Sequence, residues 1–166
     1  MISSIMTLIS KFLQYTAKEL DLQLREAGIV PRAMIIGTGT SGHISALALY
    51  FKSRYRGSVR VFGVQPVPGH SIPSLRRIET GVKWLHLVDV DEILDITLKD
   101  AIESAIEVAR KEGLIIGISS GAVVAGFRRL LERGVLEGDV ILVFPDSGFK
   151  YVELFEKYLA EKEVEI

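Results

Sequence analysis

A glycine-rich turn between a strand-like run and a helix-like run is the feature that most constrains the fold of this 166-residue chain. In residues 34–51, MIIGTGTSGHISALALYF, an apolar run ends at Gly37, and Gly39 and Gly42 complete the spacing G-x-G-x-x-G. Apolar residues then recur at helical spacing. A buried strand joined to a helix by such a turn is typical of α/β proteins, where the turn can bind an anion at the helix N-terminus.

The alternation of strand-like and helix-like segments continues along the whole chain. We expect strands over 33–37, 59–66, 83–90 and 139–148. We expect helices over 1–28 (with a break near Tyr15 and Thr16), 41–55 (capped by Ser41), 97–113 (capped by Thr97 and ended by Gly113), about 120–134, and 149–163. The pattern predicts one α/β domain over 1–166, with an N-terminal helical segment over 1–30. Its architecture is three-layer α/β/α, a mostly parallel twisted sheet with helices on both faces.

Composition excludes several classes of function. The net charge is −1, which does not favour binding to nucleic acid or to an anionic membrane. The chain has no cysteine, so it has no disulfide, thiolate metal site or catalytic thiol. His43, His70 and His86 form no cluster in the sequence, and we expect no metal site. The apolar N-terminus lacks a basic leading region, so we expect a packed helix and a cytoplasmic protein.

Three loops follow apolar runs and are rich in glycine, serine, threonine or aspartate: 37–43, 117–121 and 145–148. In parallel sheets, ligands bind at the carboxyl ends of strands. A dinucleotide site would also need an acidic residue at the end of the second strand, but residues 43–78 contain no Asp or Glu. NAD is therefore disfavoured and NADP stays a weak alternative. A phosphate monoester bound at the helix N-terminus requires no such acidic residue and therefore fits the sequence. A glycine turn with no ligand is the remaining alternative.

Several motifs in order carry a family resemblance: GTSGHIS at 39–45, QP at 65–66, SIPSLRRIETG at 71–81, GLIIGISSGA at 113–122 and PDSGFKY at 145–151. Across about residues 14–155 the chain resembles the cysteine synthases, within the tryptophan-synthase-β (type II) class of pyridoxal-phosphate enzymes. The stretches SIPSLRRIETG and PDSGFKY look most like archaeal sulfhydrylases that accept O-phosphoserine. The resemblance implies the large-domain fold of that class and binding of pyridoxal 5′-phosphate.

The resemblance also implies roles for individual residues. The phosphate-binding loop of the family matches Gly39, Thr40, Ser41, Gly42 and His43. Ser147 matches the residue that hydrogen-bonds the pyridine nitrogen, and Gly117 and Ser119 match a loop that faces the ring. Arg76, or second to it Arg77, matches the arginine that receives the substrate's phosphate, for which a guanidinium fork is suited.

Each of these residues also has a plain structural interpretation. Ser147 could cap the last helix. Arg76 and Arg77 could be solvated loop charges. The His43 side chain, at a helix start with no metal partner, is better interpreted as loop packing than as a catalytic group.

The resemblance exposes an absence as well. The family's Schiff-base lysine and its Ser/Thr-Gly-Asn-Thr substrate-carboxylate loop lie well before the phosphate loop. Here 36 residues precede Gly37, with Lys11 and Lys18 as their lysines and no matching motif for either element. We therefore expect no catalytic residue in this chain, non-covalent cofactor binding if there is any, and no β-replacement by the chain alone.

Three hypotheses remain at this point. The chain could be a component of a cysteine synthase that makes cysteine from sulfide and O-phosphoserine or O-acetylserine, in a homo-oligomer or with a lysine-bearing polypeptide. It could be a non-catalytic module that binds a phosphorylated or amino-acid ligand or pairs with a full-length enzyme. An NADP-binding domain is the least favoured hypothesis.

Overall fold

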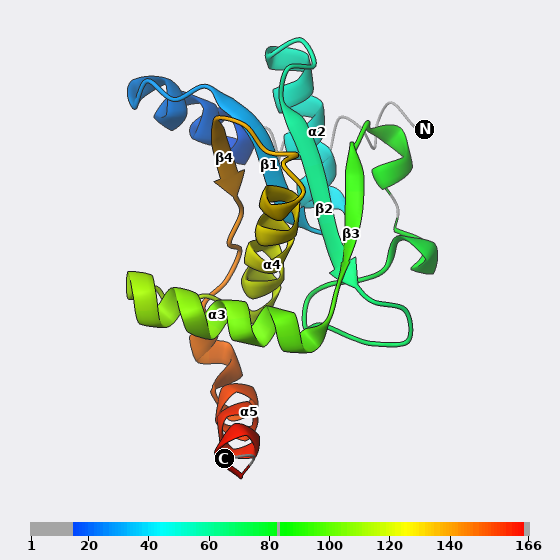
Figure 1. Cartoon of the computed structure of the whole chain (residues 1–166). Coiled ribbons are helices and arrows are strands. Elements are labelled where there is room, and N and C mark those ends of the chain that lie inside the picture. The colour runs from blue at the N-terminus through cyan, green and yellow to red at the C-terminus, as the bar shows by residue number, and fades with distance from the viewer. Residues whose placement is uncertain (1–14, 83, 165–166) are drawn as a thin grey trace.

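The computed structural model describes residues 15–82 and 84–164 (Figure 1). Residues 15–26 are helical and lead into the first strand. The strands are β1 (Pro31–Gly37), β2 (Arg60–Pro66), β3 (Glu92–Ile96) and β4 (Asp139–Leu142). The helices are α2 (Gly42–Arg54), α3 (Leu98–Glu112), α4 (Ile118–Glu132) and α5 (Val152–Val164), with short 3-10 turns η1 (Ile78–Thr80), η2 (Leu85–Leu87) and η3 (Gly148–Tyr151).

The four strands form one sheet in the order β3-β2-β1-β4, and each neighbouring pair is parallel. Parallel pairing follows from the chain path, because each connection between paired strands crosses over a face of the sheet. The carboxyl ends of all four strands therefore lie at the same end of the sheet. The predicted α/β class and parallel sheet are confirmed.

The sheet separates two apolar layers, and alternate residues of β1 belong to different layers. Ile35 packs with α3 and α4 on one face, while Met34 and Ile36 pack with α2 and the helix at 15–26 on the other. Figure 1 shows α4 in front of the strands and α2 behind them. The predicted three-layer α/β/α arrangement is thus confirmed. No helix in the described part of the chain is long and apolar enough to cross a membrane.

Small residues let α4 approach its neighbours closely. A Cβ on Gly126 would lie 2.6 Å from Cγ1 of Val64 on β2, and one on Gly121 would overlap the carbonyl oxygen of Ala101 on α3. The sequence GAVVAG therefore places α4 directly against the sheet and against α3. This close packing fixes the N-terminus of α4 beside the strand ends.

Most predicted helices are confirmed. Thr97 accepts a hydrogen bond from the Asp100 N–H at 3.0 Å, and Gly113 ends α3 in a left-handed conformation, as expected. Helix α4 begins at Ile118, two residues before the predicted start. The expected helical segment over 1–14 lies outside the described residues. The break expected near Tyr15 and Thr16 is wrong at these two residues, which belong to the helix over 15–26.

The strand predicted over 83–90 is wrong. Leu85–Leu87 form the turn η2, and the strand is β3, which begins at Glu92. Leu85, Val88 and Val90 are apolar because they pack against the core that contains α2. The last strand is also shorter than predicted and ends at Leu142.

Candidate functional site

A cavity of about 250 Å³ opens at the carboxyl ends of the strands, where three loops and the start of α4 converge. Its polar lining comes from Thr40, Ser41, His43, Ser74 and Ser119. The loop after β1 supplies Thr40 and Ser41, the first turn of α2 supplies His43, the loop after β2 supplies Ser74, and α4 supplies Ser119. Four of the predicted cofactor residues, Gly39, Thr40, Ser41 and His43, thus line the same cavity as a fifth, Ser119.

The N-terminus of α2 presents free backbone donors to this cavity. Ser41 occupies the N-cap position with a left-handed φ of 68°, but its side chain makes no capping bond, contrary to the expected cap. Its hydroxyl instead donates to the Thr40 carbonyl at 2.6 Å and accepts from the Trp84 N–H at 3.1 Å. The first helical bond is donated by Ser45, so the N–H groups of Gly42, His43 and Ile44 have no helical acceptor. Together with the helix dipole, these donors favour an anion.

The glycine loop is held against the loop that follows β2. A Cβ on Gly39 would lie 2.9 Å from the Ser74 carbonyl oxygen, so glycine permits this close approach. The Thr38 hydroxyl lies 2.9 Å from the Val64 carbonyl oxygen and 2.8 Å from that of Arg76, and its single proton can be donated to either. The Arg76 N–H donates to the Thr38 carbonyl at 2.6 Å. Thr38 therefore fixes the position of Arg76 relative to the anion-binding turn.

The start of α4 brings unpartnered hydroxyls next to the cavity. Ser119 is 2% exposed and Ser120 is fully buried, and neither hydroxyl hydrogen-bonds to a described residue. Buried polar groups are normally satisfied, so orphaned hydroxyls indicate a partner such as water or a ligand. Ser119 lines the cavity and can offer its hydroxyl to a ligand there.

The loop after β4 is clamped to the segment before α4. The Gly117 N–H donates to the Asp146 carbonyl at 3.1 Å, and the Gly148 N–H donates to the Ile115 carbonyl at 3.0 Å. The Tyr151 hydroxyl donates to Oδ2 of Asp146 at 2.8 Å. Burial raises the pKa of Tyr151, as does the Asp146 carboxylate, so the phenol stays a donor at neutral pH. Oδ1 of Asp146 is buried without a described partner.

Ser147 and Gly117 lie in this clamp and are not among the cavity's lining residues. Ser147 is exposed and accepts a long 3.4 Å hydrogen bond from the Phe149 N–H, at the start of η3. Its hydroxyl also donates to the Ile115 carbonyl at 3.3 Å. In this conformation Ser147 caps the turn η3, which leads directly into the last helix, α5.

The two candidate arginines have different surroundings. Arg77 donates to the Pro66 carbonyl at 2.5 Å and to Asp95 and Glu79, each at 2.7 Å. The Glu79 and Asp95 carboxylates raise the pKa of Arg77. Arg76 is exposed, and with Gly39, Thr40 and Trp84 it lines a second cavity of about 380 Å³ beside the glycine loop. Arg76 therefore lies beside the glycine loop, whereas Arg77 is paired with two carboxylates.

His43 is partly buried at the cavity wall, and burial lowers its pKa below the usual value. The imidazole is therefore neutral at pH 7. No lysine is among the described residues that line either cavity. Within the described chain, no group of three or more metal-ligating side chains lies close enough together to hold a metal ion.

Comparison with known proteins agrees with this geometry. The model of the pyridoxal-phosphate dependent enzyme family matches residues 8–146. The chain belongs to this family.

Its relatives include cysteine synthases. Cysteine synthase B of Escherichia coli is 35% identical over 118 residues, which cover 69% of this chain and 38% of the relative. Cysteine synthase of Aquifex aeolicus is 34% identical over 125 residues, covering 71% of this chain and 38% of that protein. The chain therefore spans well under half of the length of these relatives and is a cysteine-synthase-like domain.

Solved structures show the same fold. The O-acetylserine dependent cystathionine β-synthase of Helicobacter pylori superposes with a TM-score of 0.70 at 25% identity, covering 87% of this chain and 49% of that one. A hydrogen sulfide-producing enzyme of Fusobacterium nucleatum gives 0.69 at 27% identity, covering 82% and 48%. This likeness supports the predicted resemblance to the fold of type II pyridoxal-phosphate enzymes.

Sequence reasoning missed several residues that shape the site: Thr38, Ser74, Ser120, Asp146 and Tyr151. The last two lie within the quoted motif PDSGFKY, and Ser74 lies within SIPSLRR. Their presence in motifs was a usable signal. The contact between the Ser74 and Tyr151 hydroxyls was not predictable in this way, because it joins loops that are distant in sequence.

Proposed function

We propose that this chain holds pyridoxal phosphate as part of a cysteine-synthase-like enzyme, which replaces the β-substituent of O-phosphoserine or O-acetylserine with sulfide. One observation carries the proposal. A cavity with free backbone donors at the N-terminus of α2 lies in a chain of the pyridoxal-phosphate dependent enzyme family.

The residues at the cavity fit the cofactor. The loop from Gly39 to His43 would hold the phosphate with its N–H groups, because the uncapped helix start favours an anion. The orphaned Ser119 hydroxyl would face the ring. Gly117 would face it as well only if the Asp146 carboxylate, which fills the place of its Cβ, moved aside. Ser147, whose present hydrogen bonds are long and exposed, would turn its hydroxyl to the ring nitrogen.

When bound, pyridoxal phosphate supplies an electron sink for negative charge that develops at the substrate's α-carbon. A hydroxyl at Ser147 would leave the ring nitrogen largely unprotonated, which moderates that sink and favours β-elimination. Arg76 would bind the substrate's phosphate through a charge-assisted hydrogen-bond fork. Arg77 would instead hold the loop that carries Arg76.

We further propose that the chain alone binds the cofactor non-covalently and does not catalyse the replacement. The described cavity lining holds no lysine, the side chain that would form the Schiff base with the cofactor. A lysine-bearing polypeptide would complete the site. The same observation favours a second candidate function, a non-catalytic module that binds phosphorylated ligands.

Equilibrium binding of pyridoxal phosphate to the purified chain tests the proposal. We expect saturable binding that inorganic phosphate competes away. Gly39→Val should weaken it at least tenfold, because the side chain would push the Ser74 carbonyl into the cavity. Leu49→Ala, an exposed change farther along α2, should leave binding unchanged.

Other outcomes would point elsewhere. Borohydride treatment that fixes the cofactor to one lysine, mapped by mass spectrometry, would contradict non-covalent binding. Phosphate-competitive binding of other phosphate monoesters without pyridoxal phosphate binding would favour the non-catalytic module. Tight NADPH binding that pyridoxal phosphate does not affect would overturn the proposal.

A further inference from the structure

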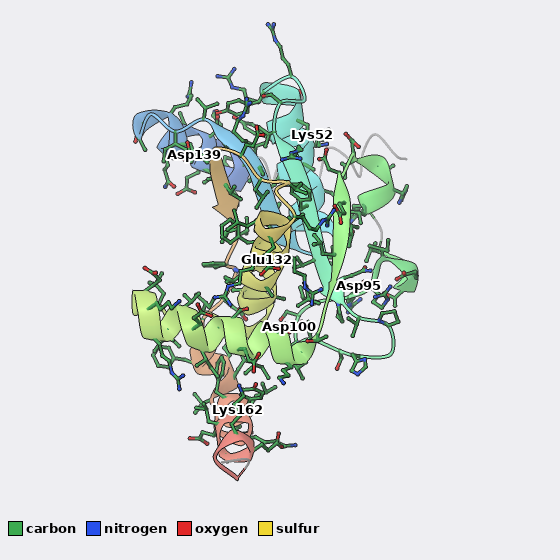
Figure 2. The ribbon with its side chains drawn as sticks, in the orientation of Figure 1. Lys52, Asp95, Asp100, Glu132, Asp139 and Lys162 are labelled. Atoms are coloured by element: carbon green, nitrogen blue, oxygen red, sulfur yellow. The ribbon has the colours of Figure 1, made fainter. Side chains whose placement is uncertain are left out.

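Strand β4 has the sequence of an interior strand but lies at the edge of the described sheet. Residues 140–144, VILVF, are all apolar, which is typical of a parallel strand that is covered on both sides. In β1, five of the seven residues are buried, including Met34–Ile36, whereas no residue of β4 is fully buried. Figure 2 shows Asp139, the first residue of β4, on the outer side of the sheet, and Asp95 of β3 near the opposite edge.

The outer edge of β4 presents backbone groups without a partner in the described chain. β4 pairs with β1, and the Val143 N–H just beyond the strand donates inward to the Ile35 carbonyl at 3.1 Å. Because successive residues of a strand alternate direction, Ile141 also faces β1, while the backbone groups of Val140 and Leu142 face outward. Exposed edges of this kind are templates for another strand.

Exposed apolar side chains lie beside this edge, close to the end of the strand. Phe144 follows it directly, and Phe149 lies a few residues on with 72% of its surface exposed. Leu114 and Ile115 are also exposed, and the Ile115 carbonyl accepts from the Gly148 N–H, which joins the two segments. We define the β4 edge surface as the outer edge of β4 with these four side chains.

We propose that the β4 edge surface pairs with a strand of a separate, lysine-bearing polypeptide of the same family. The identity of this partner rests on the proposed function. More than half of each quoted relative lies outside the match, so the family's fold contains further chain to place against this domain. Val143 and Pro145 both follow β4 and line the cavity, so a strand added here would bring its own loops to the site.

Co-expression of the full 166-residue chain with the unmatched part of Escherichia coli cysteine synthase B tests the inference. We expect the two polypeptides to co-purify as one complex. Val140→Pro removes an outward N–H while leaving the pairing with β1, and should reduce recovery of the complex at least tenfold. Val140→Ala loses similar side-chain contacts but keeps the N–H, and should behave like the wild type. Phe149→Glu, at an exposed position, should weaken the complex without affecting folding.

The outcomes separate this inference from the proposed function. Equal recovery with wild type, Val140→Pro and Phe149→Glu would overturn the edge as the docking site. No complex with a wild-type chain that still binds pyridoxal phosphate would overturn the partner and leave the proposed function standing. A homodimer that Val140→Pro converts to a monomer would make a second copy the occupant and would also overturn the inference.

Discussion

The two edges of the sheet differ in how they are finished. At β3, the Val67 N–H donates to the Ile96 carbonyl, so the Asp95 carbonyl points outward, where Nη1 of Arg129 donates to it at 2.6 Å. Arg133 pairs with Glu92 at 2.7 Å on the same strand. At β4, the outward backbone groups of Val140 and Leu142 have no partner in the described chain, and after Asp139 the side chains of the strand are apolar.

This difference indicates which edge is suited to solvent and which is suited to pairing with another strand. Charged side chains on an edge strand discourage pairing with another chain. The edge at β3 is therefore protected against pairing and suited to exposure to solvent. The run VILVF carries no such protection. The contrast implies that β3 is stabilised by its own polar contacts, whereas β4 would be stabilised by a strand from another polypeptide.

The largest expected effect comes from breaking the polar contacts at β3. Gln65 is buried, donates to Asp95 at 2.7 Å and accepts from the Ile78 N–H at 3.0 Å. Gln65→Ala should lower the free energy of unfolding by about 2 kcal/mol, because it leaves these groups without their partner. Urea denaturation measures the loss. An unchanged urea midpoint would mean that the polar contacts at the β3 edge do not stabilise the sheet.

A second test separates the two neighbouring arginines. Arg77→Ala should lower the thermal midpoint, because it removes the contacts with Asp95, Glu79 and the Pro66 carbonyl. Arg76→Ala should leave the midpoint unchanged and should instead weaken binding of O-phosphoserine in the presence of pyridoxal phosphate. Thermal scans and calorimetric titration of both variants provide the comparison. The reverse assignment of effects would show that Arg77 is the ligand contact.

The smallest effect on stability is expected at β4. Phe144→Lys places a charge beside the open edge at a partly exposed position and should change the free energy of unfolding by less than about 0.5 kcal/mol. It should, however, reduce recovery of the complex with the unmatched part of Escherichia coli cysteine synthase B, measured by co-purification. Leu159→Lys, at an exposed position of α5, is the matched control. Equal recovery of the complex with both variants would show that the β4 edge is not the docking site.

Local patterns were sufficient to predict most of the fold. The helix over 97–113 has a cap, a glycine stop and apolar spacing that all agree, and it matches α3 within a residue. The strand predicted over 83–90 failed because its apolar residues pack beneath α2 rather than into the sheet. An apolar run shows that residues are buried, and tertiary contacts decide in which element.

The candidate site was predictable only in part. The glycine loop is contiguous in sequence, so its residues and their placement beside one helix could be anticipated. The contact between Tyr151 and Ser74, and the approach of Ser74 to Gly39, join loops that follow different strands. Such contacts follow from strand order, which the pattern of apolar residues does not specify.

The contact between Gly117 and Asp146 has a consequence for how the sequence can vary. Oδ1 of Asp146 occupies the position that a Cβ on residue 117 would take. The two positions therefore share one volume, and neither can change freely while the other is kept. Among related sequences, a side chain larger than glycine at position 117 should occur together with a shorter residue at position 146. The two positions should therefore co-vary.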